Sequence, residues 1–181
     1  MEFNLESSLA LLTRTPAVLD ALLRDLPDTW ATCNEGEKTW TSVDIVGHYL
    51  YTEQVNWMPR AGHILKHGGH VPFQPFKRAG HLDEAAPRSL ENLLDEFART
   101  RAGSIAELRS WNLSPSDLTR RGLHPVLGSI TLAQLLSAWT VHDLTHLHQI
   151  TRVFAVQYAD TVGPFRKFLG VLHCAGHSEP A

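Results

Sequence analysis

Histidine is the residue type in this chain with the most scope for chemistry. The 181 residues include 11 histidines, against 3 tyrosines and 2 methionines. Imidazole titrates near pH ~6.5 and is the commonest metal ligand in proteins. The densest group lies in the segment His142-Asp143-Leu144-Thr145-His146-Leu147-His148-Gln149-Ile150. The placement of the histidines, rather than their number, decides whether they form a site.

His142 and His146 are four residues apart, so they lie one turn apart on one face of a helix. Such a pair on a rigid helix can chelate a divalent metal. Imidazoles that face an apolar interior need partners for their ring nitrogens, and a metal supplies them. The alternative is a surface or hydrogen-bonded pair without a metal. The metal is favoured by the other residues on this face, which should point into the protein: Leu135, Trp139, Gln149 and Val153.

A catalytic metal site keeps one position open and so needs a third protein ligand. His48 is the best candidate, since it lies early in a predicted helix over 42–67. If the helix of His146 runs antiparallel to that helix, His48 and His146 lie about 9 and 12 Å from the shared end. His63 lies about 22 Å further along, too far to serve the same metal. The predicted metal site is therefore His48, His142 and His146.

The remaining histidines have plainer interpretations. His63 and His67 are also four apart, but they fall at a predicted helix end, where histidine interacts well with the helix dipole. His173 and His177 form a third such pair near the end of the sequence, where we expect a frayed tail. The others fall on another helix face or in predicted loops without evident partners: His148, His70, His81 and His124.

The segments that must position these residues have helical periodicity. Long helices are expected at about 5–26, 42–67, 89–111 and 131–154, and a shorter one at 161–172. Pro16 should split the first and Pro59 should bend the second. Thr131 and Gln134 form a capping box at the start of the fourth. No run has useful strand periodicity, so residues 1–181 are predicted to be a single all-α domain, a four-helix bundle with a short extra C-terminal helix.

The connections predict the order of the helices. Residues 68–88 and 112–130 are rich in glycine and proline and should form loops. The first of these loops is long enough to run back along a helix of about 35 Å. The second and third helices are therefore expected to be parallel, which gives an up-down-down-up bundle.

Composition and charge narrow the functional classes. Lysine and arginine total 16 against 19 acidic residues, for a net charge of −3, which argues against nucleic-acid binding. Cys33 and Cys174 cannot form a disulfide framework and fit a reducing compartment, and neither looks catalytic. The start of the sequence lacks a signal peptide's basic region, and no apolar run approaches the ~18 residues of a membrane helix. We therefore expect a soluble cytoplasmic protein without a membrane partner.

Two segments resemble the motifs of the DinB-like (DinB/YfiT) superfamily. The first is Trp40-Thr41-Ser42-Val43-Asp44-Ile45-Val46-Gly47-His48-Tyr49, with a Trp, a short polar turn, an acidic residue and a His on the second helix. The second is Thr131-Leu132-Ala133-Gln134-Leu135-Leu136 followed by the segment 142–150, which is similar to H-D-x-x-H-x-x-Q-I. The resemblance covers most of the chain in order, and the second motif is its specific part.

The resemblance implies an up-down-down-up four-helix bundle, often a homodimer, with a divalent metal such as zinc or nickel on His48, His142 and His146. Better-understood relatives use a low-molecular-weight thiol such as bacillithiol or mycothiol. The expected function is therefore a metal-dependent thiol S-transferase, whose thiolate attacks a small electrophilic substrate. The alternatives are a metal-dependent hydrolase, which uses water instead, and a non-catalytic metal-binding protein related to stress.

Two residues beside the predicted ligands are candidates to orient them, because a ligating His usually donates its other N–H to an acceptor. These are Asp143 and Gln149. Asp143 lies about 100° round the helix from His142, so a solvated surface acid is an equal alternative for it. The five tryptophans are expected in the core rather than in a stacking platform: Trp30, Trp40, Trp57, Trp111 and Trp139.

Overall fold

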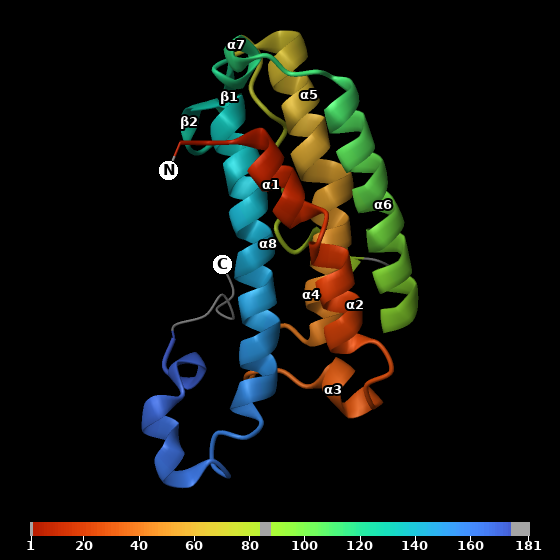
Figure 1. The fold of residues 1–181 in the computed structure, drawn as a ribbon, viewed down its shortest axis with the longest axis vertical. Helices are drawn as coiled ribbons and strands as arrows, with labels where there is room; N and C mark the ends of the chain where they lie inside the picture. Colours follow the sequence, from red (N-terminus) through yellow and green to blue (C-terminus); the bar gives the residue numbers. More distant parts are fainter. Residues whose placement is uncertain (1, 84–87, 175–181) are drawn as a thin grey trace.

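The computed structural model describes residues 2–83 and 88–174, and long helices dominate it, as predicted (Figure 1). They form four rods that pack side by side. The first rod is α1 (Leu5–Leu12) and α2 (Thr15–Leu23), and the second is α4 (Ser42–Thr52), a π-helix (Glu53–Trp57) and α5 (Met58–His67). The third is α6 (Leu90–Ser110) and the fourth is α8 (Leu132–Val156).

Proline shapes the first two rods. The expected split of the first occurs where α2 begins, with Pro16 in its opening turn. In the second, Pro59 follows directly on the π-helix and lies in the first turn of α5. Because proline has no N–H to donate to the preceding turn, the regular hydrogen-bond ladder cannot continue through it. The predicted bend at Pro59 thus takes the form of one wide turn in the middle of the rod.

Side-chain caps set where the rods that carry the histidines begin. Thr41 caps α4 in a capping box with Asp44, and Thr131 caps α8 in the predicted capping box with Gln134. Each box satisfies backbone N–H groups that have no partner within the helix. The start of α4 at Ser42 is therefore fixed six residues before His48.

The prediction of no strands was wrong. Strands β1 (Arg121–His124) and β2 (Gly128–Thr131) pair antiparallel as a hairpin just before α8. Four residues are too few to show a clear alternation of polar and apolar positions. The hairpin packs closely on the second rod, since a Cβ at Gly122 would lie 2.7 Å from the side chains of Ile64 and Phe73. The backbone N–H of Phe73 donates to the carbonyl of Leu123 at 2.9 Å, which ties the segment after α5 to the hairpin.

The remaining elements are short. They are α3 (Asp28–Thr32), α7 (Pro115–Leu118) and 3-10 helices at Gly80–Asp83 (η2), Gly163–Phe168 (η3) and Gly170–Leu172 (η4). The last two stand where a C-terminal helix over 161–172 was expected. Gly163 adopts a positive φ of 52° and Pro164 lacks an N–H, so a regular α-helix cannot run through this segment. His177, the second member of the expected tail pair, lies outside the described residues.

Contacts between the rods give their relative directions. Tyr49 packs on Phe97 and Glu53 pairs with Arg101, so residue numbers rise together along the second and third rods, which are parallel. Residues 68–79 lead back along the bundle from the end of α5 (Figure 1). The ring of His48 lies against that of His142, whereas Trp57 stacks on Trp139 nearer the start of α8, so the second and fourth rods are antiparallel.

The core has two apolar halves. One is built around Trp57, Ile64, Leu108 and Trp139, and the other around Ile45, Leu50, Phe97 and Ile150. A layer of buried polar side chains lies between them. The expectation of core tryptophans holds for Trp57 and Trp139, while Trp30, Trp40 and Trp111 are half-buried.

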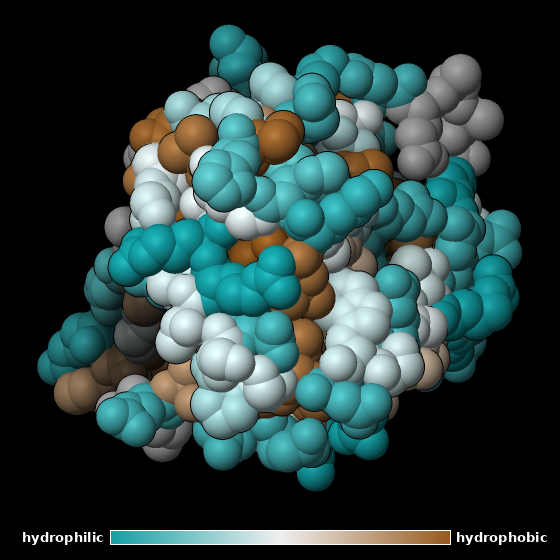
Figure 2. Space-filling model, turned by 90° about the horizontal axis from the view of Figure 1, so that it is seen from above, coloured by the Kyte–Doolittle hydropathy of each residue, from teal (hydrophilic) through white to brown (hydrophobic). Residues whose placement is uncertain are grey.

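The face of the molecule shown in Figure 2 is mainly hydrophilic or of intermediate hydropathy. Figure 2 looks down on the end of the bundle where α5 ends and α8 begins, and it shows small hydrophobic areas between polar side chains. No helix within the described residues has both the length and the hydropathy of a membrane span.

Candidate metal centre

The three predicted ligands meet in the polar layer. His48 comes from α4, and His142 and His146 come from successive turns of α8. One ring nitrogen of each lies within 4.8 Å of those of the other two, and no other such group of His, Cys, Asp or Glu occurs in the described part of the chain. His48 and His146 are buried, with 2% and 3% of their surface exposed, and His142 is half-buried. The structure thus brings together the three histidines singled out by spacing.

The ring nitrogens are spaced as metal ligands would be. Nε2 of His48 lies 3.1 Å from Nε2 of His142. Two nitrogens bound to one tetrahedral Zn²⁺ at 2.0–2.1 Å would be about 3.3 Å apart. Three imidazoles from two rigid helices therefore fit a divalent ion and leave a further coordination position for another molecule.

Gln149 fixes the tautomer of His146. Its side-chain carbonyl lies 2.7 Å from Nδ1 of His146, and both residues are buried. Because that carbonyl can only accept, Nδ1 carries the hydrogen and Nε2 keeps its lone pair. This is the arrangement by which a neighbouring acceptor orients a metal-binding histidine.

His48 is held in its neutral form by its surroundings. Burial lowers its pKa to about 2, and the charges of His146 and His81 act in the same direction. The backbone carbonyl of Arg78 acts in the opposite direction. Trp40 covers the site, since its ring centroid lies 4.8 Å from that of His48 and 6.1 Å from that of His146. A neutral imidazole is the form that binds a metal.

His81 corrects the interpretation of the loop histidines. It was expected to have no partner, but it is buried on η2, 5.2 Å between ring centroids from His48 and 4.8 Å from Trp40. Burial lowers its pKa. Its position in the sequence gave no signal, because η2 has no periodicity and reaches the site only through the return of residues 68–83 along the bundle.

Asp143 also corrects an expectation, because it is neither a surface acid nor bonded to a ligand histidine. It is buried, and its two carboxylate oxygens accept from Nη1 and Nη2 of Arg101 at 2.6 and 3.1 Å. The same guanidinium donates to Glu53 at 3.0 Å and to the carbonyl of Leu12 at 2.9 Å. Nearby, the hydroxyl of Tyr49 donates to the Asp143 carbonyl.

This network supports the face of α8 that carries His142 and His146. Arg101 has 1% of its surface exposed and is paired on two sides, so its pKa is raised despite burial. Burial raises the pKa of Glu53. Arg101 was missed from the sequence, yet it carries a signal: it lies four residues from both Phe97 and Ile105, within the apolar stripe of α6.

The other described histidines stay apart from the centre. His63 and His67 contact each other at the end of α5, and Nε2 of His63 bonds to the carbonyl of Val71 at 2.8 Å. His173 bonds to the carbonyl of Arg166. Cys33 is half-buried and Cys174 is exposed, and both are free thiols.

The model of the DinB superfamily matches residues 11–150. The chain belongs to the DinB superfamily. The match takes in His48, His142 and His146 and the network behind them. No curated protein matches the chain.

Two solved structures share the fold of this DinB-superfamily chain. YfiT from Bacillus subtilis superposes with a TM-score of 0.72 at 18% identity, over 87% of each chain, and is described as a probable metal-dependent hydrolase with an unusual four-helix bundle topology. The four-helix bundle protein TT2238 gives a TM-score of 0.53 at 20% identity, over 84% of this chain and 97% of that one. The predicted four-helix bundle is thereby confirmed.

Proposed function

We propose that this DinB-superfamily protein binds one divalent metal ion through His48, His142 and His146 and is a metal-dependent enzyme acting on a small molecule. The observation that carries the proposal is the convergence of three ring nitrogens within 4.8 Å. The neutral state of His48 and the fixed tautomer of His146 support it. Zinc and nickel are the expected ions, since imidazole suits both.

A bound ion of this kind supplies Lewis acidity, which activates a nucleophile at neutral pH. The chain's own residues hold that centre in place. Gln149 orients His146, and Trp40 covers the rings of His48 and His146 on one side. Arg101 and Asp143 keep the third and fourth rods in register. Two rigid helices thus present the ligands with little reorganisation on binding.

Hydrolysis is the reaction class we propose. The fold similarity to YfiT, described as a probable metal-dependent hydrolase, supports it. A triad with an open coordination position suits water and a small thiol equally well, so its geometry does not choose between the two nucleophiles. Thiol S-transfer to an electrophile therefore stays a prediction of the sequence motifs. The comparisons give thiol transfer no support of their own.

The proposal also covers the order of the rods, the oligomeric state of the protein and its cellular compartment. The parallel second and third rods and the antiparallel fourth rod support up-down-down-up order. A homodimer in the cytoplasm is the setting we infer from the sequence motifs and the two free cysteines. Sedimentation of the purified protein would test the dimer.

Metal analysis tests the first part of the proposal. The purified protein should hold about one divalent ion per chain, and His48→Ala and His142→Ala should each lose it. His148→Ala is the matched control on α8, because His148 lies outside the triad. A wild-type protein without stoichiometric metal, or variants that retain it, would refute the triad as a metal site.

Turnover is tested separately on the metal-loaded protein. One arm offers water as the nucleophile, with small esters and amides as substrates, and a second offers a low-molecular-weight thiol with a halogenated aromatic electrophile. We expect turnover in the first arm that His142→Ala abolishes. Turnover in the second arm alone would favour thiol transfer, and none in either arm would favour a non-catalytic metal-binding protein.

A further inference from the structure

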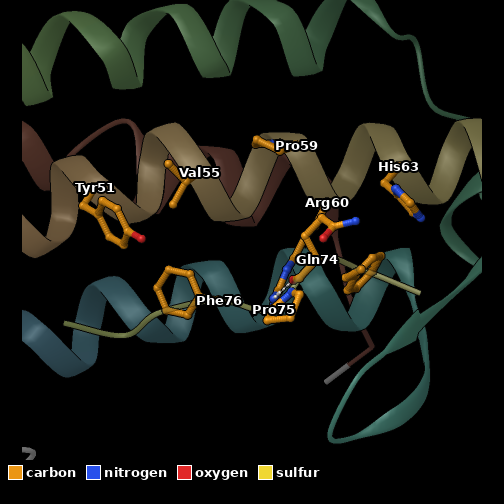
Figure 3. Close-up of a pocket in the computed structure, with 9 residues that line it drawn as sticks. Tyr51, Val55, Pro59, Arg60, His63, Gln74, Pro75 and Phe76 are labelled. Atoms are coloured by element: carbon orange, nitrogen blue, oxygen red, sulfur yellow. Dashed lines mark hydrogen bonds between the residues drawn. The ribbon is translucent and has the colours of Figure 1, made fainter. Parts of the chain in front are cut away.

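A second pocket lies on the second rod, beyond the metal centre. It has a volume of about 290 Å³ and lies between the rod and the extended segment 73–76 (Figure 3). In Figure 3, Tyr51 and Phe76 are at one end and His63 is at the other, with Arg60 reaching across toward Gln74 and Pro75. This size is near the lower limit for pockets that bind small organic molecules.

Arg60 gives this pocket its chemical character. Its guanidinium lies 5.1 Å from the ring centre of Phe73 and 5.8 Å from that of Phe76. It donates one hydrogen bond, at 3.3 Å, to the carbonyl of Gln74. Arginine carries five N–H donors, so the described residues leave most of its capacity unused. None of the interactions of Arg60 with described residues is an ion pair. Burial lowers the pKa of its guanidinium.

The surroundings of Arg60 are positive or neutral. The residues that line the pocket include no acid. His63 forms part of the lining, and the charge of Arg60 reaches His124. Elsewhere in the described chain, the buried Arg101 is compensated by two carboxylates. A partly buried, uncompensated cation in a protein of net charge −3 indicates that an anion from outside completes this pocket.

We propose that this pocket binds a small monocyclic aromatic molecule that bears an oxyanion, with Arg60 as the anion receptor. The guanidinium fork matches the oxygens of a carboxylate or a phosphate ester. The aromatic side chains of Tyr51, Phe73 and Phe76 line the space for the ring of the ligand. Aromatic pairs add attraction beyond the area that they bury.

This site is separate from the metal centre. Arg60 lies twelve residues beyond His48 in the same rod, which is about 18 Å along its axis. Tyr51, which lines the pocket, has its ring centroid 6.4 Å from that of His81, and His81 in turn lies 5.2 Å from His48. The inference therefore does not depend on the proposed metal-dependent activity, and each can fail without the other.

Calorimetric titration of the full chain with sodium phenylacetate tests the proposal. We expect saturable binding, at least about ten-fold weaker binding of the neutral phenylacetamide, and no binding of inorganic phosphate alone. Arg60→Gln should weaken phenylacetate at least about ten-fold, and Arg60→Lys should weaken it less, since it keeps the charge without the fork. Arg99→Gln, an exposed change on α6, and His48→Ala should leave binding unchanged.

Phenyl phosphate in a parallel titration separates the two oxyanions, because tighter binding of it assigns the pocket to phosphate esters. The proposal is overturned if neither aromatic anion binds the folded wild-type protein at about 10 mM. Equal affinity for phenylacetamide, or undiminished binding by Arg60→Gln, would also overturn it. If Arg60→Gln does not fold, as judged by circular dichroism, the comparison of ligands on the wild-type protein decides the question.

Discussion

At the scale of single residues, the centre depends on how each imidazole is oriented. His146 and Gln149 are three residues apart on α8, so their side chains lie on the same face of the helix. The amide carbonyl takes the Nδ1 hydrogen at 2.7 Å and leaves Nε2 for a metal. His48 depends instead on burial, which keeps its ring neutral.

Gln149→Ala is expected to weaken metal binding about 10–100-fold while leaving the protein folded, because His146 loses the acceptor that orients it. Competition with a chromophoric chelator measures the affinity. Gln157→Ala is the control, since it removes an amide at the end of the same helix, away from the centre. Equal affinity in the wild-type protein and Gln149→Ala would show that this hydrogen bond does not support the site.

The low pKa of His48 predicts an acid-sensitive metal-free protein. Between pH 6.5 and 2 the unfolded chain binds a proton at this histidine and the folded chain does not, so the free energy of unfolding falls as the pH falls below 6.5. From pH 6.5 to 5 the loss from His48 alone is roughly 2 kcal/mol. Urea unfolding at several pH values in the presence of a chelator measures it, and the dependence should be shallower in His48→Gln.

At the scale of elements, one buried arginine on the third rod links all four rods of the bundle. Arg101 on α6 pairs with Glu53 on the π-helix and Asp143 on α8, and it donates to the Leu12 carbonyl at the end of α1. The π-helix that carries Glu53 directly precedes the turn with Pro59. The network lies between the two apolar halves of the core and gives the rods a defined register.

Arg101→Met is expected to destabilise the protein by about 3–5 kcal/mol, because it leaves two buried carboxylates without their cation. Chemical denaturation measures the change. Arg99→Met, two residues away and exposed, should change stability by less than about 0.5 kcal/mol. A small effect of Arg101→Met would mean that Glu53 and Asp143 adapt by taking up protons.

At the scale of the whole molecule, a bound metal would tie the second rod to the fourth. His48 is on one and His142 and His146 are on the other, and these two rods run antiparallel. A ligand that binds only the folded state stabilises it by mass action. Metal binding at this centre would therefore couple the proposed function to folding.

Zinc or nickel at 100 times its dissociation constant should stabilise the wild-type protein by about 2.7 kcal/mol. For a chain of this size that corresponds to a rise in Tm of roughly 5–10 °C. Calorimetry with and without metal measures the rise, which should be absent in a variant lacking all three histidines and preserved in His148→Ala. A rise in the triple variant would place the metal elsewhere.

The sequence by itself determined the helical class, the starts of the two rods that carry the ligands, and the three histidines of the candidate centre. These features follow from local sequence patterns. The patterns are the capping residues of α4 and α8, the four-residue spacing of His142 and His146, and the two family motifs. Local patterns are visible because they act within a few turns of one helix.

Tertiary structure alone decided the surroundings of that centre. His81 lies beside His48, and Arg60 lies between Phe73 and Phe76, only because residues 68–83 return along the second rod. Asp143 is a buried partner of Arg101, 42 residues away in the sequence, because α6 and α8 pack together at that level. Such contacts depend on how the rods are arranged in space, which the spacing of residues within one rod does not specify.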